Sequence, residues 1–306
     1  MRFMEIFRKI SQFIKQIINF KKLDGHYIIV FFCFSFKFKY KQKYTVPVIN
    51  QTGITDKKRI IPIVASITST PNKINSLHQV IKSLLVQDFK PDYLILYLSD
   101  KQFKDREGSL PDNLLDLKRY GLEIRWCSDV GNFKRLVPAL RDFKNAIIIT
   151  FDDSVFYKKD AISILYNSYL DSPDCIIANR IERLKIKGGK IREDKTYKLL
   201  AKKFSKPSYM TRPVNSGGVL YPPDCFNEEI FNDNVFYNLA PNYDDIWYWA
   251  MAVLNNTKTK VSKGYRNSLI KLDFDGNINE TQNLSINEAY KIILDKYPEV
   301  YEKLKH

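Results

Sequence analysis

Histidine and cysteine are scarce in this sequence, and their scarcity argues against several kinds of site. The 306 residues include three histidines and four cysteines, and no two cysteines form a C-x-x-C pair. A histidine-based zinc site is therefore not expected, and a Ser-His-Asp triad in the main body has only His78 to draw on. The separated cysteines are typical of reduced thiols in a cytosolic protein. Carboxylates are thus expected to carry most of any chemistry.

Long apolar runs are also missing. The apolar stretch near the N-terminus covers only residues 27–36, whereas a helix that crosses a bilayer needs about 20 residues. No small-residue cleavage site follows this stretch, so a signal peptide is not expected. The composition, 44% hydrophobic and 14% aromatic, supplies a large core and excludes a disordered chain, a collagen and a disulfide scaffold.

Positive charge is in excess and is concentrated in two segments. Lys and Arg number 49 against 34 Asp and Glu; residues 1–60 hold 13 basic and 3 acidic side chains, and residues 180–212 hold 12 and 3. In the first segment, apolar residues recur at helical three-and-four spacing from Phe3 to Ile18, and lysines flank the apolar stretch that follows. We therefore expect residues 1–58 to form a basic amphipathic extension.

Two interpretations of this extension are open. A helix and hairpin would lie on an anionic cytoplasmic membrane surface, where each basic group near the lipid contributes on the order of 1 kcal/mol. Alternatively, the helix simply packs on the main domain. The joint occurrence of apolar stripe and basic flank favours the membrane surface. Nucleic acid would attract the same charge, but no recognised DNA- or RNA-binding motif accompanies it, so no nucleic-acid partner is expected.

The remainder of the chain alternates between apolar, β-rich runs and segments with helical periodicity. Strands are predicted over residues 60–68, 92–100, 122–127 and 146–150, and helices over 77–87, 110–121 and 134–143. This alternation predicts an α/β domain, residues 59–306, with a doubly wound, mostly parallel sheet and flanking helices. In such sheets, ligands bind beyond the carboxyl ends of the strands.

Acidic residues follow the last of these predicted strands. The sequence there reads FDDSVFY, with Asp152, Asp153 and Ser154 in a row. Two adjacent carboxylates behind a buried strand are costly unless they are solvated, paired or bound to a cation. Asp and Ser are also favoured helix caps, but a cap needs only one such residue. The run is therefore interpreted as a site for a divalent metal and a phosphate group.

Six segments occur in an informative order along the chain. They are SITSTPNKI, SLLVQDFKPDYLILYLSD, DVGNFKRLVPAL, IIITFDDSVFY, NSGGVLYPP and DDIWYWAMA. In this order they resemble a bacterial glycosyltransferase family of the GT-A type (family 2-like), found in surface-polysaccharide and lipooligosaccharide biosynthesis. The resemblance covers about residues 60–285, and it implies a GT-A-like fold and a hexosyltransferase-like enzyme.

The resemblance also implies roles for particular residues. Those expected to bind the donor nucleotide and its diphosphate are Thr68, Ser69, Thr70, Lys73, Asp129, Lys134 and Asp152. Asp152, Asp153 and Ser154 match an acidic cluster that holds Mn²⁺ or Mg²⁺ in the family. Ser154 departs from the usual third aspartate, which leaves open whether it ligates the ion directly or through a water.

Two further motifs acquire roles from the same resemblance. Gly217 and Gly218 lie in a segment that borders the donor sugar in the family, although Gly-Gly is also a plain turn into a strand. Asp245 is the expected catalytic base, with Asp244 supporting it or ligating the metal; the alternative is that both only begin a helix. Trp247 is a candidate for stacking on a sugar, and core packing is its alternative.

The second basic segment, residues 180–212, carries a hairpin signal at Gly188 and Gly189 and scattered charge. It is expected to be an exposed excursion. An anionic acceptor, such as a phosphorylated lipid-linked glycan, would bind there, or the segment is merely a solvated surface.

Together these features predict a glycosyltransferase that moves a sugar from a nucleoside-diphosphate donor to a glycan or lipid-linked glycan acceptor, assisted by Mn²⁺ or Mg²⁺. It is expected to be cytoplasmic and peripheral on the inner face of the cytoplasmic membrane. The alternatives are a non-catalytic carbohydrate-binding or assembly protein with a degenerate GT-A fold, and a basic nucleic-acid-binding protein.

Overall fold

The structure is a computed structural model that describes residues 18–23, 26–31, 34–39, 44–193, 205–239, 243–263, 269–271 and 285–305. It divides into two compact units, Met1–Thr45 and Val46–His306. The predicted boundary at residues 58 and 59 therefore falls inside the second unit. Among the described residues, no helix combines the length and the apolar character that crossing a membrane requires.

The first unit contains a three-stranded antiparallel sheet, ordered β1-β2-β3. Its strands are β1 (Ile18–Leu23), β2 (His26–Phe31) and β3 (Phe34–Lys39). The predicted amphipathic helix before β1 lies outside the described residues, except for Ile18.

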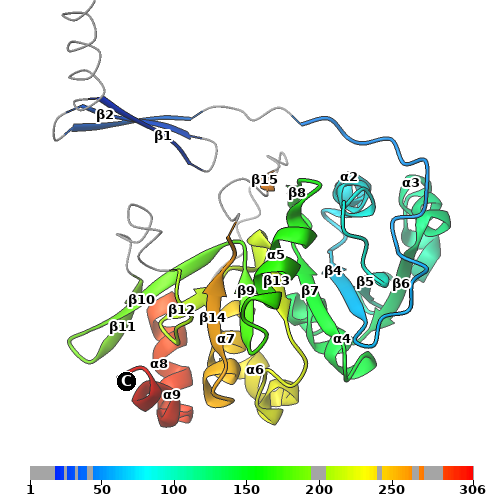
Figure 1. Cartoon of the computed structure of the whole chain (residues 1–306). Helices are drawn as coiled ribbons and strands as arrows, with labels where there is room; N and C mark the ends of the chain where they lie inside the picture. Colours follow the sequence, from blue (N-terminus) through cyan, green and yellow to red (C-terminus); the bar gives the residue numbers. More distant parts are fainter. Residues whose placement is uncertain are drawn as a thin grey trace, which may run out of the picture. The chain divides into compact units, whose positions relative to one another are not determined.

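The second unit is built on a seven-stranded sheet, ordered β14-β9-β13-β7-β4-β5-β6 (Figure 1). Its strands are β4 (Ile63–Thr68), β5 (Tyr93–Ser99), β6 (Leu122–Cys127), β7 (Ile147–Phe151), β9 (Cys175–Ala178), β13 (Val219–Tyr221) and β14 (Lys258–Val261). Strands β4 to β7 run parallel, as do β9 and β14, whereas β13 is antiparallel to β7 and β9. The predicted mostly parallel sheet is thus confirmed.

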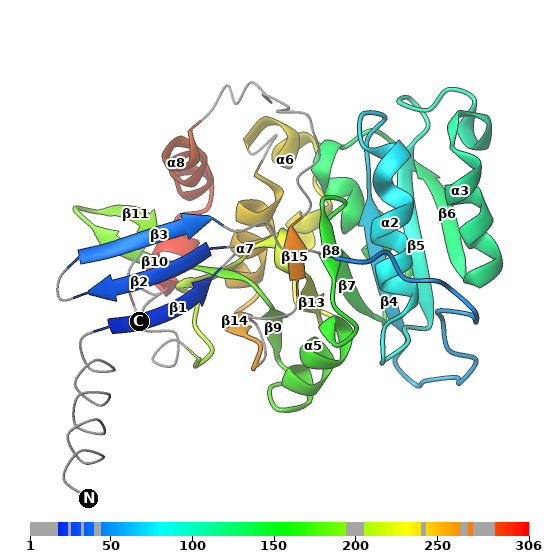
Figure 2. The ribbon, with the colours of Figure 1, turned by 90° about the horizontal axis from the view of Figure 1, so that it is seen from above.

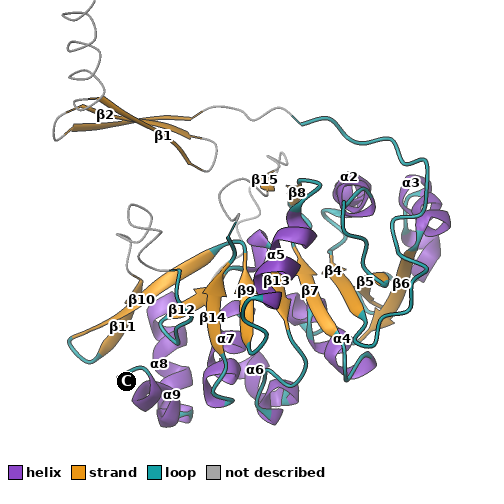
Figure 3. Ribbon diagram, viewed as in Figure 1, coloured by secondary structure: helices purple, strands orange, loops and turns teal. Residues whose placement is uncertain are grey.

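Helices cover both faces of this sheet, which explains why β4 and β7 are mainly apolar and are buried along their whole length (Figure 3). Successive strand residues point to opposite faces, so Ile63 and Ala65 join one core and Val64 joins the other. The first core receives α2 (Ile74–Leu85), α3 (Asp112–Leu115) and α5 (Ala161–Leu170). The second receives α4 (Val137–Asp142), α6 (Asp233–Leu239), α7 (Asp244–Leu254), α8 (Ile286–Lys296) and α9 (Pro298–Lys303).

Smaller elements complete the unit. A second sheet, ordered β11-β10-β12, contains β10 (Ile181–Lys187), β11 (Lys190–Glu193) and β12 (Thr211–Pro213), and α8 lies beside β11 (Figure 2). The predicted hairpin is confirmed, since Gly188 and Gly189 both have positive φ between β10 and β11. Strand β8 (Val155–Tyr157) pairs with β15 (Leu269–Lys271). The 3₁₀ helices among the described residues are η1 (Arg106–Ser109), η2 (Asp116–Tyr120), η3 (Gly131–Arg135), η6 (Asn215–Gly217) and η7 (Glu228–Phe231).

Several predicted elements are shorter or broken in the structure, for local reasons. The strand predicted from residue 60 begins at Ile63, because Pro62 before it has no N–H to donate to a ladder. The helix predicted over 110–121 divides into α3 and η2 and ends at Gly121, whose φ is 105°. The helix predicted over 134–143 divides at Leu136, where Pro138 favours a fresh helix start.

Candidate active site

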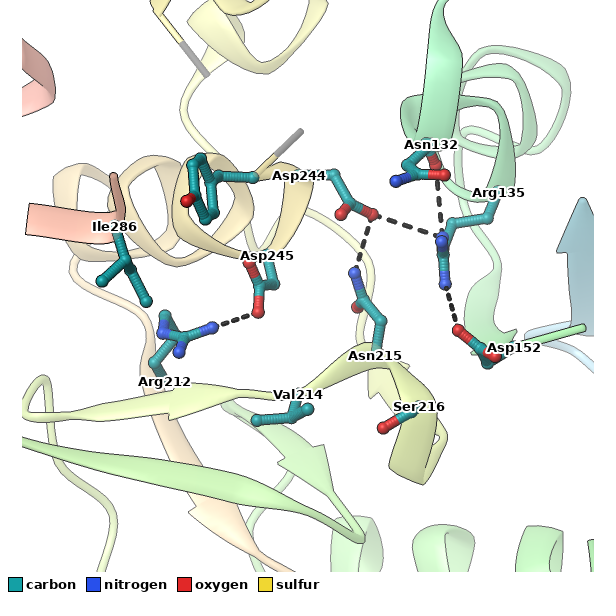
Figure 4. Close-up of a pocket in the computed structure, with 11 residues that line it drawn as sticks. Asn132, Arg135, Asp152, Arg212, Val214, Asn215, Ser216, Asp244, Asp245 and Ile286 are labelled. Atoms are coloured by element: carbon teal, nitrogen blue, oxygen red, sulfur yellow. Dashed lines mark hydrogen bonds and ion pairs between the residues drawn. The ribbon is translucent and has the colours of Figure 1, made fainter. Parts of the chain in front are cut away.

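A cavity of about 280 Å³ lies where several loops meet beyond the end of β7 (Figure 4). Three carboxylates face it, those of Asp152, Asp244 and Asp245, together with the guanidinium groups of Arg135 and Arg212. Asn132, Val214, Asn215, Ser216, Tyr243 and Ile286 complete its lining. The volume is near the lower end of the range for small-molecule sites. Its charged lining favours a polar ligand.

Arg135 connects the two acidic motifs of the chain. Its Nη1 lies 3.4 Å from Oδ2 of Asp152, and its Nε lies 3.2 Å from Oδ2 of Asp244 (Figure 4). Its Nε also donates to the carbonyl of Asn132 at 3.2 Å. Asp152 follows β7, Asp244 begins α7, and Arg135 ends η3, so the guanidinium links three separate elements. The side chain of Arg135 is 9% exposed, and these contacts compensate its buried charge.

Asp153 contacts residues at the end of β4 and before α2. Its Oδ2 accepts a hydrogen bond from Oγ of Ser69 at 2.8 Å, and its Oδ1 lies 2.9 Å from Nζ of Lys73. Burial and then the charge of Asp152 raise the pKa of Asp153. Lys73 lies directly before α2, so this ion pair ties the start of that helix to the loop after β7.

Ser154 supports Asp152. Its backbone N–H donates to Oδ1 of Asp152 at 2.9 Å, and its hydroxyl donates to the same oxygen. Although burial acts to raise it, the pKa of Asp152 is lowered by Arg135 and by these hydrogen bonds. The N–H of Asp152 donates to the hydroxyl of Tyr157 at 2.9 Å, and that hydroxyl donates to the carbonyl of Ser216 at 3.2 Å. The loop after β7 is thereby held against η6.

The predicted metal site at Asp152, Asp153 and Ser154 is not formed. Within the described part of the chain, no three His, Cys, Asp or Glu side chains gather as a metal-binding group. The carboxylates of Asp152 and Asp153 turn to different cations of the chain, Arg135 and Lys73. Asp153 and Ser154 lie in a turn after β7, so their proximity to Asp152 in the sequence does not bring the carboxylate oxygens together. The donor set does not fit a divalent ion.

At the other side of the cavity, Asp245 pairs with Arg212 (Figure 4). Nη1 of Arg212 donates to Oδ2 of Asp245, and Nη2 donates to Oε1 of Glu193 at 2.9 Å. The side chain of Arg212 is 4% exposed, whereas those of Asp245 and Glu193 are 20% and 27% exposed. Arg212 therefore joins β12 to the start of α7 and to the end of β11 while Asp245 stays accessible from the cavity.

Asp244 lies deeper than Asp245. Its Oδ2 accepts a hydrogen bond from Nδ2 of Asn215 at 2.8 Å, in addition to its pairing with Arg135. Burial raises the pKa of Asp244 to about 6, and the charge of Arg135 opposes that rise. Asn215 in turn accepts a hydrogen bond from the hydroxyl of Tyr221 at 3.3 Å. A carboxyl with this pKa can exchange a proton near neutral pH.

The structure brings the predicted nucleotide-binding pair Asp129 and Lys134 into contact. Nζ of Lys134 lies 3.0 Å from Oδ1 of Asp129, and Nε2 of Gln102 lies 3.1 Å from both carboxylate oxygens. The Lys134 side chain is 1% exposed and that of Asp129 is 22% exposed. Neither belongs to the described residues that line the 280 Å³ cavity. They lie beside it, because Lys134 directly precedes Arg135.

Other residues expected in the site have structural roles. The hydroxyl of Thr68 donates to the carbonyl of Tyr97 at 2.7 Å, and the carbonyl of Thr70 accepts from the N–H of Lys73 at 3.0 Å. Trp247 is completely buried and packs against the rings of Phe236 and Tyr297. A sugar-stacking role for Trp247 is therefore not supported, because its ring belongs to the core.

The two glycines of the NSGG segment shape the floor of the cavity. A Cβ on Gly217 would lie 2.4 Å from Cβ of Arg180 and 2.6 Å from its backbone nitrogen. Gly218 has a φ of 82°, which a side chain disfavours. Gly217 lets η6 approach Arg180 closely, and η6 presents Asn215 and Ser216 to the cavity.

Sequence reasoning missed the two buried arginines that organise the site. Arg135 lay in one of the recognised segments, KRLVPAL, but no role was assigned to it. Arg212 belongs to the second basic segment, residues 180–212, which is predicted to be an exposed excursion, yet its side chain is among the most buried of the charged groups described. No local pattern distinguishes these arginines from surface ones, because their partners come from distant segments of the chain.

Comparison with known proteins gives likenesses at the level of the fold. No protein-family model and no curated protein sequence matches the chain. Among solved structures, TarS 1–349 of S. aureus in complex with UDP-GlcNAc is similar, with 12% identity over 76% of this chain and 64% of that chain and a TM-score of 0.46. GalNAc-T7 with UDP, GalNAc and Mn²⁺ shows 10% identity over 79% of this chain and 50% of that chain, with a TM-score of 0.47. The chain thus spans less than two thirds of each.

Proposed function

We propose that this protein is a GT-A-like glycosyltransferase that moves a sugar from a nucleoside-diphosphate donor to a glycan or lipid-linked glycan acceptor. One observation carries the proposal. The two acidic motifs that resemble those of such enzymes, at Asp152 and at Asp244 and Asp245, come from distant parts of the sequence and face one cavity. That cavity lies beyond the carboxyl end of a parallel strand, where α/β sheets bind ligands.

The donor half of the reaction needs positive charge beside the leaving group. When the bond between the anomeric carbon and the diphosphate oxygen breaks, its electron pair passes to the diphosphate. The cavity offers the guanidinium of Arg135, and the amide of Asn215 and the hydroxyl of Ser216 supply neutral hydrogen-bond donors. The ion pair of Asp129 and Lys134, next to Arg135, supports a nucleotide site beside the cavity.

The acceptor half needs a group that removes a proton. An acceptor hydroxyl forms the new bond to the anomeric carbon through its oxygen, and its proton passes to a nearby base. Asp245 suits this role because it lines the cavity and its side chain is 20% exposed. Arg212 holds it in place from β12. Asp244, which is buried against Arg135 and Asn215, suits a supporting role.

The experiment that tests this function screens sugar nucleotides in two assays. UDP-, GDP-, CDP- and ADP-sugars are added to the full chain, each with Mn²⁺ and with EDTA, and thermal stability and release of the nucleoside diphosphate are measured. A ligand at about 100 times its dissociation constant stabilises the folded state by about 2.7 kcal/mol. We expect one nucleotide class to stabilise the protein and to be hydrolysed slowly. No stabilisation by any of them would refute a nucleotide-sugar transferase.

A second candidate is a carbohydrate-binding or assembly protein that keeps the fold without turnover. The observation that favours it is that Asp152, Asp153, Asp244 and Asp245 each already pair with a cation of the chain. Glycan binding without release of nucleotide in the same screen would favour this second function.

The proposed location is the inner face of the cytoplasmic membrane, with an anionic lipid surface as partner. The support for it is the concentration of 13 basic and 3 acidic side chains in residues 1–60, next to an apolar stripe. Sedimentation with vesicles of phosphatidylglycerol, with neutral vesicles as control, tests this proposal.

A further inference from the structure

A divalent ion that served both acidic motifs would have to lie between Asp152 and Asp244, and that position belongs to Arg135. The guanidinium reaches Oδ2 of each carboxylate, at 3.4 Å and 3.2 Å (Figure 4). A metal ion there would have to break both ion pairs and approach a fixed positive charge. The third contact of Arg135, to the carbonyl of Asn132, anchors the guanidinium on its own 3₁₀ helix.

The other carboxylate oxygens of Asp152 and Asp153 also already have partners within the chain. Oδ1 of Asp152 accepts two hydrogen bonds from Ser154, which stands where a third carboxylate would be expected. Both oxygens of Asp153 are taken, one by Ser69 and one by Lys73. Asp153 is 8% exposed, so its carboxylate has little access to a further ligand. Residues 152–154 therefore do not direct several free oxygens toward one point, which a hard divalent ion requires.

We propose that Arg135 takes the place of a divalent cation between the two acidic motifs, so that the cavity binds a nucleoside diphosphate without a metal ion. The exclusion of the metal follows from the contacts of Arg135, Asp152 and Asp153 and does not depend on the proposed function. The statement about the nucleoside diphosphate rests on the proposed function. A guanidinium suits this role because it stays charged at any physiological pH and presents several planar donors, which match phosphate oxygens.

The direct test measures binding of Mn²⁺ alone to the full chain, by the loss of the free-ion electron paramagnetic resonance signal. The unmutated protein and Arg135→Lys, which keeps the charge, are expected to bind no ion more tightly than about 1 mM, the weak end of known protein sites. Arg135→Gln leaves Asp152 and Asp244 uncompensated, so it should gain one Mn²⁺ site at least about tenfold tighter. Asp152→Asn in the Arg135→Gln background should abolish that site.

Two results would overturn the proposal. One is a stoichiometric Mn²⁺ site in the unmutated protein that disappears in Asp152→Asn; this result does not depend on whether Arg135→Gln folds. The other is a folded Arg135→Gln, verified by circular dichroism, that gains no Mn²⁺ site.

A second arm separates this inference from the proposed function. UDP, GDP, CDP and ADP are titrated into the unmutated protein by calorimetry, with Mn²⁺ and with EDTA. The nucleotide that binds should do so with an affinity that EDTA changes less than about twofold; a requirement for Mn²⁺ overturns the inference. If none of the four binds in either condition, the proposed function fails, while the Mn²⁺ measurement still decides the role of Arg135.

Discussion

The assignment of Asp245 as the base can be tested against a matched carboxylate. Asp245 and Glu193 both accept hydrogen bonds from Arg212, through Nη1 and Nη2. Their side chains are exposed to similar degrees, 20% and 27%. Asp245 lines the cavity, whereas Glu193 is not among the described residues that do so. Asp245→Asn and Glu193→Gln therefore each remove one negative charge beside Arg212, but only Asp245 lines the cavity in which the reaction is proposed to occur.

The expected effects on stability are small and alike. Each amide keeps an oxygen that accepts from Arg212, and Arg212 retains one carboxylate in either variant. The loss in the free energy of unfolding is therefore below the penalty for a wholly uncompensated buried charge, about 3 to 5 kcal/mol. It should not exceed the value of one hydrogen bond to a charged group, about 1.5 to 3 kcal/mol. The expected effects on transfer are unequal. Loss of a general base lowers turnover by about 10²- to 10⁴-fold, so only Asp245→Asn should show it.

Three measurements decide the matter: turnover of the donor with an acceptor glycan, affinity for the donor nucleotide, and urea unfolding. We expect Asp245→Asn to lose turnover while donor affinity changes less than about threefold, because the base acts on the acceptor. Glu193→Gln should keep both. Near-normal turnover in a folded Asp245→Asn would refute the assignment. Equal losses in the two variants would show that Arg212, and not basicity at Asp245, is the sensitive element.

Three further predictions concern proton linkage, the membrane and backbone packing. Burial raises the pKa of Asp244 from 3.8 to about 6, so the folded state holds this proton more tightly than the unfolded chain does. The free energy of unfolding should therefore fall by about 2 kcal/mol between pH 4 and 6 relative to Asp244→Asn, measured by urea unfolding; parallel pH profiles would contradict this. Deleting residues 1–45, the first compact unit, should release the protein from phosphatidylglycerol vesicles without loss of nucleotide binding. If the shortened protein sediments with these vesicles as much as the full chain does, the membrane proposal is wrong. Gly217→Ala should lower the free energy of unfolding by about 1 to 3 kcal/mol, because the added Cβ would lie 2.6 Å from the backbone nitrogen of Arg180. Gly108→Ala is the matched control and should be nearly neutral, because its added Cβ would make only an ordinary 3.5 Å contact.

Local sequence determined the sheet and the place of the acidic motifs. Strands β4, β5 and β7 are visible as mainly apolar runs because both of their faces are buried, and that requirement is written into consecutive residues. The edge strand β6 is only partly buried, and its apolar residues alternate with Glu123 and Arg125. The position of Asp152 directly after β7 follows from the same reading, since the strand ends where the charge begins. The antiparallel insertion of β13 between β7 and β9 was not predicted, because strand order depends on pairing between distant segments.

Tertiary structure alone decided what each charged group does. Asp152 and Asp153 are neighbours in sequence, yet one pairs with Arg135 of η3 and the other with Lys73 before α2, because these cations reach the turn after β7 from different elements. Arg212 belongs to a basic segment whose composition indicates a solvated surface, yet it is buried between two carboxylates. A charged group is tolerated in the interior only when partners reach it from elsewhere in the chain. Such partners are brought together by packing, which no local pattern of residues encodes.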